Sequence, residues 1–292
     1  MKNILCLLVI SFLLLTSCSK EEANIEILHP TLNAQQGSNL SPDDIAAIHN
    51  NGMSYCYDSL LHLKQLNYPN DSLLLYNYKY ATRYLSNALS ISEDTIILAL
   101  NSWGITESNY LNGTAFSCFG NDSSTAASIN SLPNQVLRYY FTQLLIIVDT
   151  SNYYEDFENS CLALLSIAHA SYEQNNELSY DEYTQFDAVC KIAVASCQYW
   201  KDYYNNWSNQ FGEIPPVIKS KNEIQAKQTF HPTVKRVLKR DIEGAGSGAI
   251  WGLIGGGAAT LGVGAGAAAL FGACCGATYL SAWEGLCAAI GW

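Results

Sequence analysis

The carboxyl-terminal part of this sequence lacks charged side chains. Residues 244–283 include no acidic or basic residue, and residues 241–292 contain neither lysine nor arginine although they hold 14 of the chain's 20 glycines. A helix on the surface of a soluble enzyme normally carries charged residues on its outer face. The composition therefore disfavours a soluble enzyme in this segment and indicates a membrane-active peptide.

Basic residues are scarce in the whole chain. Fifteen Lys and Arg stand against 26 Asp and Glu, which gives a net charge of -11 and a pI near 4.8. Nucleic-acid binding needs clustered basic residues, so no nucleic-acid partner is expected. Seven of the 15 basic residues lie within residues 213–240, directly before the charge-free segment.

The sequence also lacks the patterns of a catalytic or metal site. Its five histidines are scattered, and no Cys or His spacing resembles a zinc site. Cys118, in a predicted loop, is a better disulfide partner than nucleophile, and His169 is expected in the core. We therefore predict no enzyme activity, no metal and no cofactor. An enzyme in residues 41–212 remains only a third hypothesis.

The amino terminus has the features of an exported lipoprotein. Residues 1–17 form an expected signal peptide, in which an apolar run, Ile4–Leu15, follows Lys2. Leu15-Thr16-Ser17-Cys18 resembles a bacterial lipobox, so Cys18 is the expected lipid-attachment site and residues 18–40 the tether. The charged residues after Cys18 resemble the surface-export tag of Bacteroidetes lipoproteins, which implies the outer membrane and the cell surface. The alternative is an ordinary signal peptide with an incidental Cys18.

Residues 41–212 predict an all-α body, because no run shows sustained two-residue alternation. Ser41 and Ser179 are expected helix caps, the latter with Glu182 in a capping box. At about 170 residues the body is long enough for its own core. The expected helices span about residues 42–66, 70–89, 93–103, 133–148, 152–174 and 180–207. A loop is expected over residues 104–132.

Residues 213–240 predict a basic, flexible linker that proteases can reach. Pro215-Pro216 cannot continue a helix, and residues 217–240 carry seven basic residues against the single acid Glu223. Lys235-Arg236 and Lys239-Arg240 are the expected sites of an arginine-directed enzyme. The alternative is a basic face that contacts anionic lipid headgroups.

Residues 241–292 repeat glycine at steps of four, which predicts a helical hairpin with closely packed backbones. Two passes, 246–264 and 266–284, fit this length, and the zipper would let helices self-associate in lipid. The expected zipper positions are Gly244, Gly248, Gly252, Gly256, Gly262, Gly266, Gly272 and Gly276.

Disulfides are permitted if the chain is exported. Cys190 and Cys197 lie about two helical turns apart, too far to bond each other, but either could reach Cys161 across a helical hairpin. In the tail, Cys274 or Cys275 could pair with Cys287.

The layout of lipobox, acidic helical pro-region, basic site and Gly/Ala-rich tail resembles Bacteroidales lipoprotein bacteriocin precursors. The resemblance implies release by a clostripain-like, arginine-specific cysteine protease such as fragipain. Arg240 would be the residue recognised and Asp241 the first residue of the toxin, with Arg236 and Lys239 as secondary candidates. The tail also resembles glycine-zipper class II bacteriocins, although Asp241, Glu243 and Glu284 make it acidic.

We therefore expect a surface lipoprotein precursor of an antibacterial peptide that permeabilises the membrane of related bacteria. Its expected partners are the activating protease, the target membrane, a receptor favoured by the acidic tail, and an immunity protein. The alternative is an uncleaved outer-membrane structural or adhesion lipoprotein whose hairpin associates with a membrane.

Overall fold

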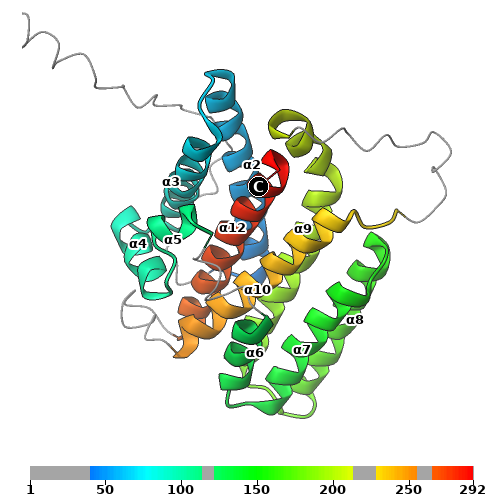
Figure 1. Ribbon diagram of the computed structural model, residues 1–292. Coiled ribbons are helices and arrows are strands. Elements are labelled where there is room, and N and C mark those ends of the chain that lie inside the picture. The colour runs from blue at the N-terminus through cyan, green and yellow to red at the C-terminus, as the bar shows by residue number, and fades with distance from the viewer. Residues whose placement is uncertain (1–39, 114–121, 213–227, 255–264, 292) are drawn as a thin grey trace, which may run out of the picture.

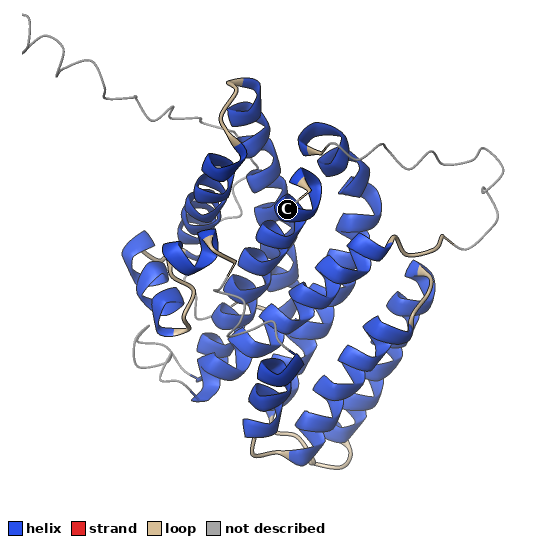
Figure 2. Cartoon of the chain, viewed as in Figure 1, coloured by secondary structure: helices blue, strands red, loops and turns tan. Residues whose placement is uncertain are grey.

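The structure, a computed structural model, describes residues 40–113, 122–212, 228–254 and 265–291. These residues form ten α-helices and no strand, so the all-α prediction is confirmed (Figures 1 and 2). The expected signal peptide, Cys18, most of the tether and Cys118 lie outside the described residues. The helices are α2 (Pro42–Gln65), α3 (Asn70–Leu89), α4 (Glu93–Ser102), α5 (Glu107–Leu111), α6 (Asp122–Ser131), α7 (Gln135–Thr150), α8 (Tyr154–Glu173), α9 (Tyr180–Phe211), α10 (Pro232–Ile254) and α12 (Ala265–Ile290).

Short-range hydrogen bonds fix where the long helices begin. The hydroxyl oxygen of Ser41 accepts from the amide of Asp44 at 3.2 Å, and the carboxylate of Asp44 accepts in return from the amide of Ser41 at 2.9 Å. Ser179 and Glu182 form the same reciprocal pair at the start of α9, as the sequence predicted. Such capping boxes satisfy amide groups that have no partner inside the helix.

The loop expected over residues 104–132 is wrong in part, because the described residues of this stretch contain α5 and α6. Thr106 caps α5, since its hydroxyl accepts from the amide of Asn109 at 3.1 Å. The sequence of α6 is mostly Ser, Ala and Asn, which gives little local preference for a helix. Contacts with α7 and α10, together with the buried Ile129, hold it instead. Tertiary packing therefore overrides the local signal.

The carboxyl-terminal hairpin lies inside the helical body. Figure 1 shows α12, in red, in the middle of the molecule, and it contacts α2, α3, α9 and α10. Buried hydrophobic side chains of α2 to α9 and of α10 and α12 form one continuous cluster. The expectation that residues 41–212 have a core of their own is therefore corrected: the tail supplies part of that core.

The end of the expected flexible linker is also helical. Residues 232–240 are the first part of α10, which continues without interruption into residues 241–254. Val234, Val237, Leu238 and Ile242 follow helical spacing and are all buried, which explains why this basic segment folds. Residues 213–227 lie outside the described residues.

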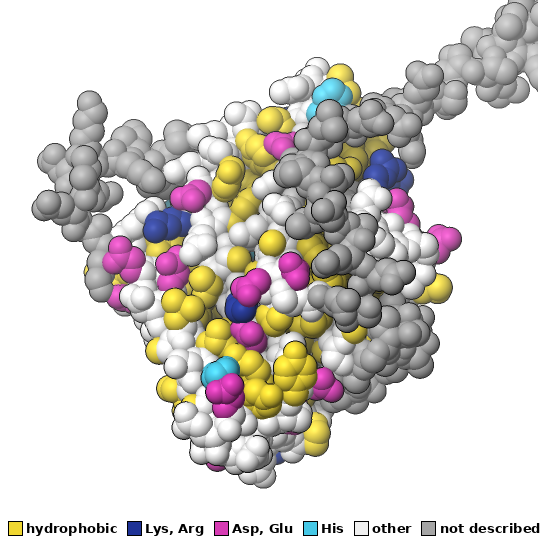
Figure 3. Space-filling model, turned by 180° about the vertical axis from the view of Figure 1, so that it is seen from behind, with side chains coloured by type: hydrophobic (Ala, Val, Ile, Leu, Met, Phe, Trp, Pro, Cys, Tyr) yellow, Lys and Arg dark blue, Asp and Glu magenta, His cyan; other side chains and the backbone are white. Residues whose placement is uncertain are grey.

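The surface of the body mixes hydrophobic and acidic side chains. Figure 3 shows hydrophobic groups reaching the surface among scattered Asp and Glu on one face. The large hydrophobic side chains with the greatest exposure are Leu66, Leu98, Tyr139, Ile146, Leu162, Ile167, Tyr180 and Tyr203.

Candidate cleavage site and glycine hairpin

The glycines of α10 and α12 face each other across the hairpin. The opposed positions are Gly244 with Gly276, Gly248 with Gly272, and Gly252 with Ala268. At each of these glycines an added Cβ would lie less than 3.0 Å from a backbone oxygen of the other helix. The spacing therefore produces the close backbone approach that the sequence predicted, but in the folded chain it joins two helices of one molecule.

The other predicted zipper positions differ. Gly266 faces α9, where an added Cβ would lie 3.0 Å from a carboxylate oxygen of Asp181. Gly256 and Gly262 lie outside the described residues. The two expected membrane passes, 246–264 and 266–284, are only partly described, and no helix within the described residues has the length and apolar character needed to cross a membrane.

Specific polar contacts fix α12 in the body. The side-chain amide of Asn77, on α3, donates to the carbonyl oxygen of Ala282 at 2.8 Å and to the hydroxyl of Tyr110 at 2.9 Å. The indole of Trp283 donates to the backbone oxygen of Tyr110 at 3.1 Å, and the hydroxyl of Tyr279 pairs with that of Thr82. The hairpin is therefore bonded to its surroundings at defined atoms as well as packed against them.

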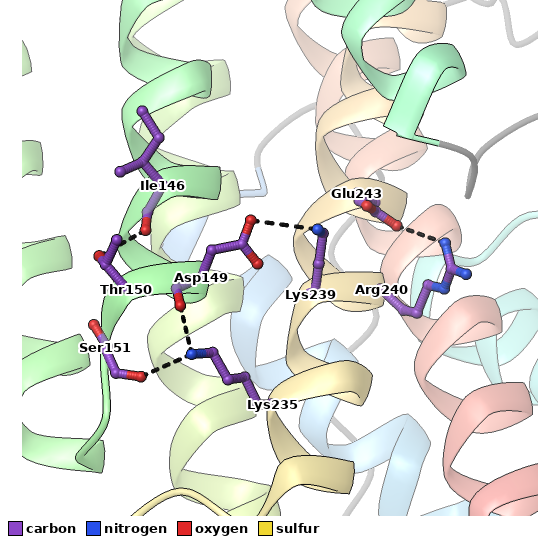
Figure 4. A network of polar contacts seen from close by, with 8 residues as sticks. All are labelled: Ile146, Asp149, Thr150, Ser151, Lys235, Lys239, Arg240 and Glu243. Atoms are coloured by element: carbon purple, nitrogen blue, oxygen red, sulfur yellow. Dashed lines mark hydrogen bonds and ion pairs between the residues drawn. The ribbon is translucent and has the colours of Figure 1, made fainter.

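The two lysines near the expected cut bind the end of α7 (Figure 4). The ammonium group of Lys235 donates to the backbone oxygens of Asp149, at 2.6 Å, and Ser151, at 3.0 Å. Lys239 donates to the carboxylate of Asp149 at 3.3 Å. The last carbonyls of a helix have no partner inside it, so a lysine at this position satisfies them and favours the negative end of the dipole.

The two arginines bind acids of the tail. The guanidinium of Arg240 lies 2.8 Å from the carboxylate of Glu243 and 3.9 Å from that of Glu284. Arg236 donates to the other carboxylate oxygen of Glu284. The side chain of Glu284 is only 7% exposed, so the arginines supply the charge that a nearly buried carboxylate requires.

The Arg240–Asp241 peptide bond lies inside α10. Asp241 is completely buried, and its carboxylate accepts a hydrogen bond from the hydroxyl of Ser196. Nε2 of His49 lies 3.9 Å from the same carboxylate oxygen. Burial raises the pKa of the Asp241 carboxyl well above its usual range. A protease can cut this bond only after α10 opens, because proteolysis of a folded chain acts on its opened forms.

The cysteines named as possible disulfide partners are all buried free thiols: Cys161, Cys190, Cys197, Cys274, Cys275 and Cys287. The structure does bring α8 and α9 together, and the sulfur of Cys190 lies 3.9 Å from the backbone oxygen of Cys161. Cys275 and Cys287 both lie on α12, about 18 Å apart at 1.5 Å per residue. The pairing proposed for the tail does not form while α12 is intact, because bonded cysteines need Cα atoms within about 7 Å.

The described residues contain no group of three or more His, Cys, Asp or Glu that could hold a metal ion. His169, expected in the core, lies at the surface, where its Nε2 is 3.4 Å from Glu173. An open pocket of about 370 Å³ lies between α6, α7 and α10 and includes Asp149, Lys239 and Glu243 in its lining. Comparison of the chain with protein families, curated proteins and solved structures gave no match in any of the three.

Proposed function

We propose that the protein is a surface lipoprotein precursor of an antibacterial peptide, in which the helical body holds a membrane-active hairpin until proteolysis releases it. One observation carries the proposal: the segment without charge, residues 244–283, lies within a glycine-packed hairpin whose described residues are almost all buried among amphipathic helices. A body that surrounds such a hairpin keeps it out of water before release.

Release would leave the hairpin with an apolar outer surface. Leu270, Phe271 and Leu280 of α12 are buried in the body, and they would face water in the free peptide. Transfer of such groups into lipid is favourable by roughly 25 cal/mol per Å² of apolar surface. The glycine contacts between α10 and α12 let the two helices remain paired as they enter, and further copies could then associate in the bilayer.

Activation by cleavage after Arg240 requires α10 to open first. Lys235, Lys239, Arg236 and Arg240 are all engaged in the folded chain, and Asp241 is buried. The folded precursor is thus its own inhibitor. Related bacteria are the expected targets, with a receptor on the target cell, and an immunity protein is the expected protection for the producer.

The test uses the purified full chain with an arginine-specific cysteine protease. We expect a fragment that begins at Asp241, releases dye from liposomes and inhibits related strains. Arg240→Lys keeps the cation beside Glu243 but removes the arginine that the protease recognises, so it should block both cleavage and activity. Arg83→Lys, at an exposed arginine of α3, is the matched control. A fragment cut after Arg240 that leaves liposomes sealed and strains growing would overturn the proposal.

A second function is favoured by the continuity of α10 across the expected cut. In that case the protein is an uncleaved outer-membrane structural or adhesion lipoprotein, and the hairpin serves as the core of its helical domain. Mass spectrometry of producing cultures separates the two functions. The second function is supported if the cultures contain only the intact chain and if the Arg240→Lys variant has the same effect on related strains as the wild type.

A further inference from the structure

Four helices meet at the carboxyl group of Asp241. It projects from α10 and accepts from Ser196 of α9, while Nε2 of His49, on α2, lies 3.9 Å away. Ser281 of α12 lies beside it and accepts from the indole of Trp200 at 3.2 Å. Asp241 and His49 are both 0% exposed, so this is a polar junction in the centre of the core.

The hydrogen bonds around His49 determine its tautomer, and so which ring nitrogen has a free lone pair. The amide nitrogen of Asn50 donates to the backbone oxygen of Ala195 at 2.9 Å, so the amide oxygen of Asn50 points to Nδ1 of His49, also at 2.9 Å. Nδ1 therefore carries a proton and donates it. Nε2, the nitrogen nearest the carboxyl group, is then the acceptor in the neutral ring.

The charged groups around the junction favour a protonated pair. Glu284, from α12, raises the pKa of Asp241 further, although Arg236 and Arg240 bind that glutamate. α9 contributes the uncharged Ser196 and Trp200 to the junction, and α2 contributes His49. An isolated carboxylate buried in this way costs several kcal/mol, so the group is either protonated or paired with a protonated imidazole.

We propose that Asp241 and His49 together keep one proton in the folded protein, and that this shared proton makes the packing of α10 against α2 and α9 depend on pH. The two limiting forms, a neutral acid beside a neutral imidazole and a carboxylate beside an imidazolium, contain the same number of protons. The proton count of the folded pair is therefore one in either form. Burial raises the pKa of Asp241 and lowers that of His49 to about 4, which agrees with this count.

The direction of the pH dependence follows from the proton count of the unfolded chain. With ordinary pKa values of 3.8 for Asp and 6.5 for His, the unfolded pair also holds one proton between these values, so stability is flat there. Above pH 6.5 the unfolded pair loses its proton while the folded pair keeps it, and the folding equilibrium weakens by up to about tenfold per pH unit. Near pH 4 the unfolded aspartate and the folded His49 each take up a second proton, so the proton counts of the two states stay equal and this pair adds no further pH dependence there.

The experiment measures urea unfolding of the full chain from pH 4.5 to 8.5. The wild type should lose stability above pH 6.5 relative to Asp241→Asn, because the remaining His49 of that variant is neutral in both the folded and the unfolded chain above this pH. His49→Gln should already lose stability between pH 4.5 and 6.5, where the wild type is flat, because the unfolded aspartate alone releases its proton at 3.8 while the folded carboxyl group keeps its own. Asp94→Asn, at an exposed acid in the first turn of α4, is the control and should run parallel to the wild type.

The slope of stability between pH 4.5 and 6.5 distinguishes His49→Gln from the wild type even if Asp241→Asn folds poorly, because His49→Gln keeps the carboxyl group. Parallel profiles of the wild type and His49→Gln over the whole range would overturn the proposal, as would parallel profiles of the wild type and a folded Asp241→Asn above pH 6.5. The inference concerns folding alone, so it stands or falls separately from the release of a toxin.

Discussion

Gly248 of α10 packs directly on Gly272 of α12, so that a Cβ at either position would lie less than 3.0 Å from the carbonyl oxygen of the other residue. Backbone cannot move aside as a flexible side chain can. Gly248→Ala should therefore destabilise the protein by about 2–3 kcal/mol, the usual cost of overpacking a core. Urea unfolding followed by circular dichroism measures the change.

Gly246→Ala on the same helix is the matched control. An added Cβ there would be 3.4 Å from the ring of Phe141, an ordinary van der Waals contact. Alanine gains about 1 kcal/mol over glycine in helix propensity, so this variant should be neutral or more stable. Equal losses in both variants would mean that the close approach of α10 and α12 contributes nothing specific.

Local signals in the sequence predicted much of this fold and the glycine contacts. Ser41 and Ser179 act within three residues of chain, so their capping is visible without a structure. Glycines at every fourth position predict close helix packing for the same reason, because the pattern follows from helix geometry alone. This glycine spacing does not determine whether the partner helix belongs to the same chain.

Contacts between distant residues could not be predicted from these patterns. His49 and Ser196 meet Asp241 across 192 and 45 residues of chain, and no local motif joins them. Likewise, basic residues before the tail suggested an exposed linker, but Asp149 and Glu284 bind them in the fold. The apolar spacing of Val234, Val237 and Leu238 was the available signal for a helix there.

The arginine–glutamate contacts predict an asymmetric response to mutation. The side chain of Arg236 is 55% exposed, whereas that of Glu284 is 7% exposed. Removing both Arg236 and Arg240, as a double Gln variant, leaves a nearly buried carboxylate without its partners and should cost about 3 kcal/mol or more. Glu284→Gln leaves arginines that reach water, so it should cost about 1 kcal/mol. Unfolding free energies at pH 6 measure both, and a larger loss for Glu284→Gln would contradict the assignment.

The two lysines should also differ in their effect. Lys235 satisfies two backbone oxygens at the end of α7, so Lys235→Ala should cost about 1–2 kcal/mol and weaken hydrogen-exchange protection in the last turn of that helix. Lys239 makes a partly exposed ion pair with Asp149, and Lys239→Ala should cost at most about 0.5 kcal/mol. Comparable losses from the two would count against a capping role for Lys235.

Cleavage after Arg240 should follow the opening of the hairpin. If α10 must open before a protease reaches the Arg240–Asp241 bond, the rate of cutting is proportional to the population of the open form. A loss of about 2 kcal/mol in Gly248→Ala would then raise the initial rate about 30-fold under arginine-specific protease, while Gly246→Ala would leave it unchanged or lower it. Adding Arg240→Lys to Gly248→Ala should abolish the fragment that begins at Asp241, which identifies the bond being cut. A Gly248→Ala variant that is less stable but cut at the wild-type rate would mean that the protease reaches this bond without unfolding α10, contrary to the buried position of Asp241.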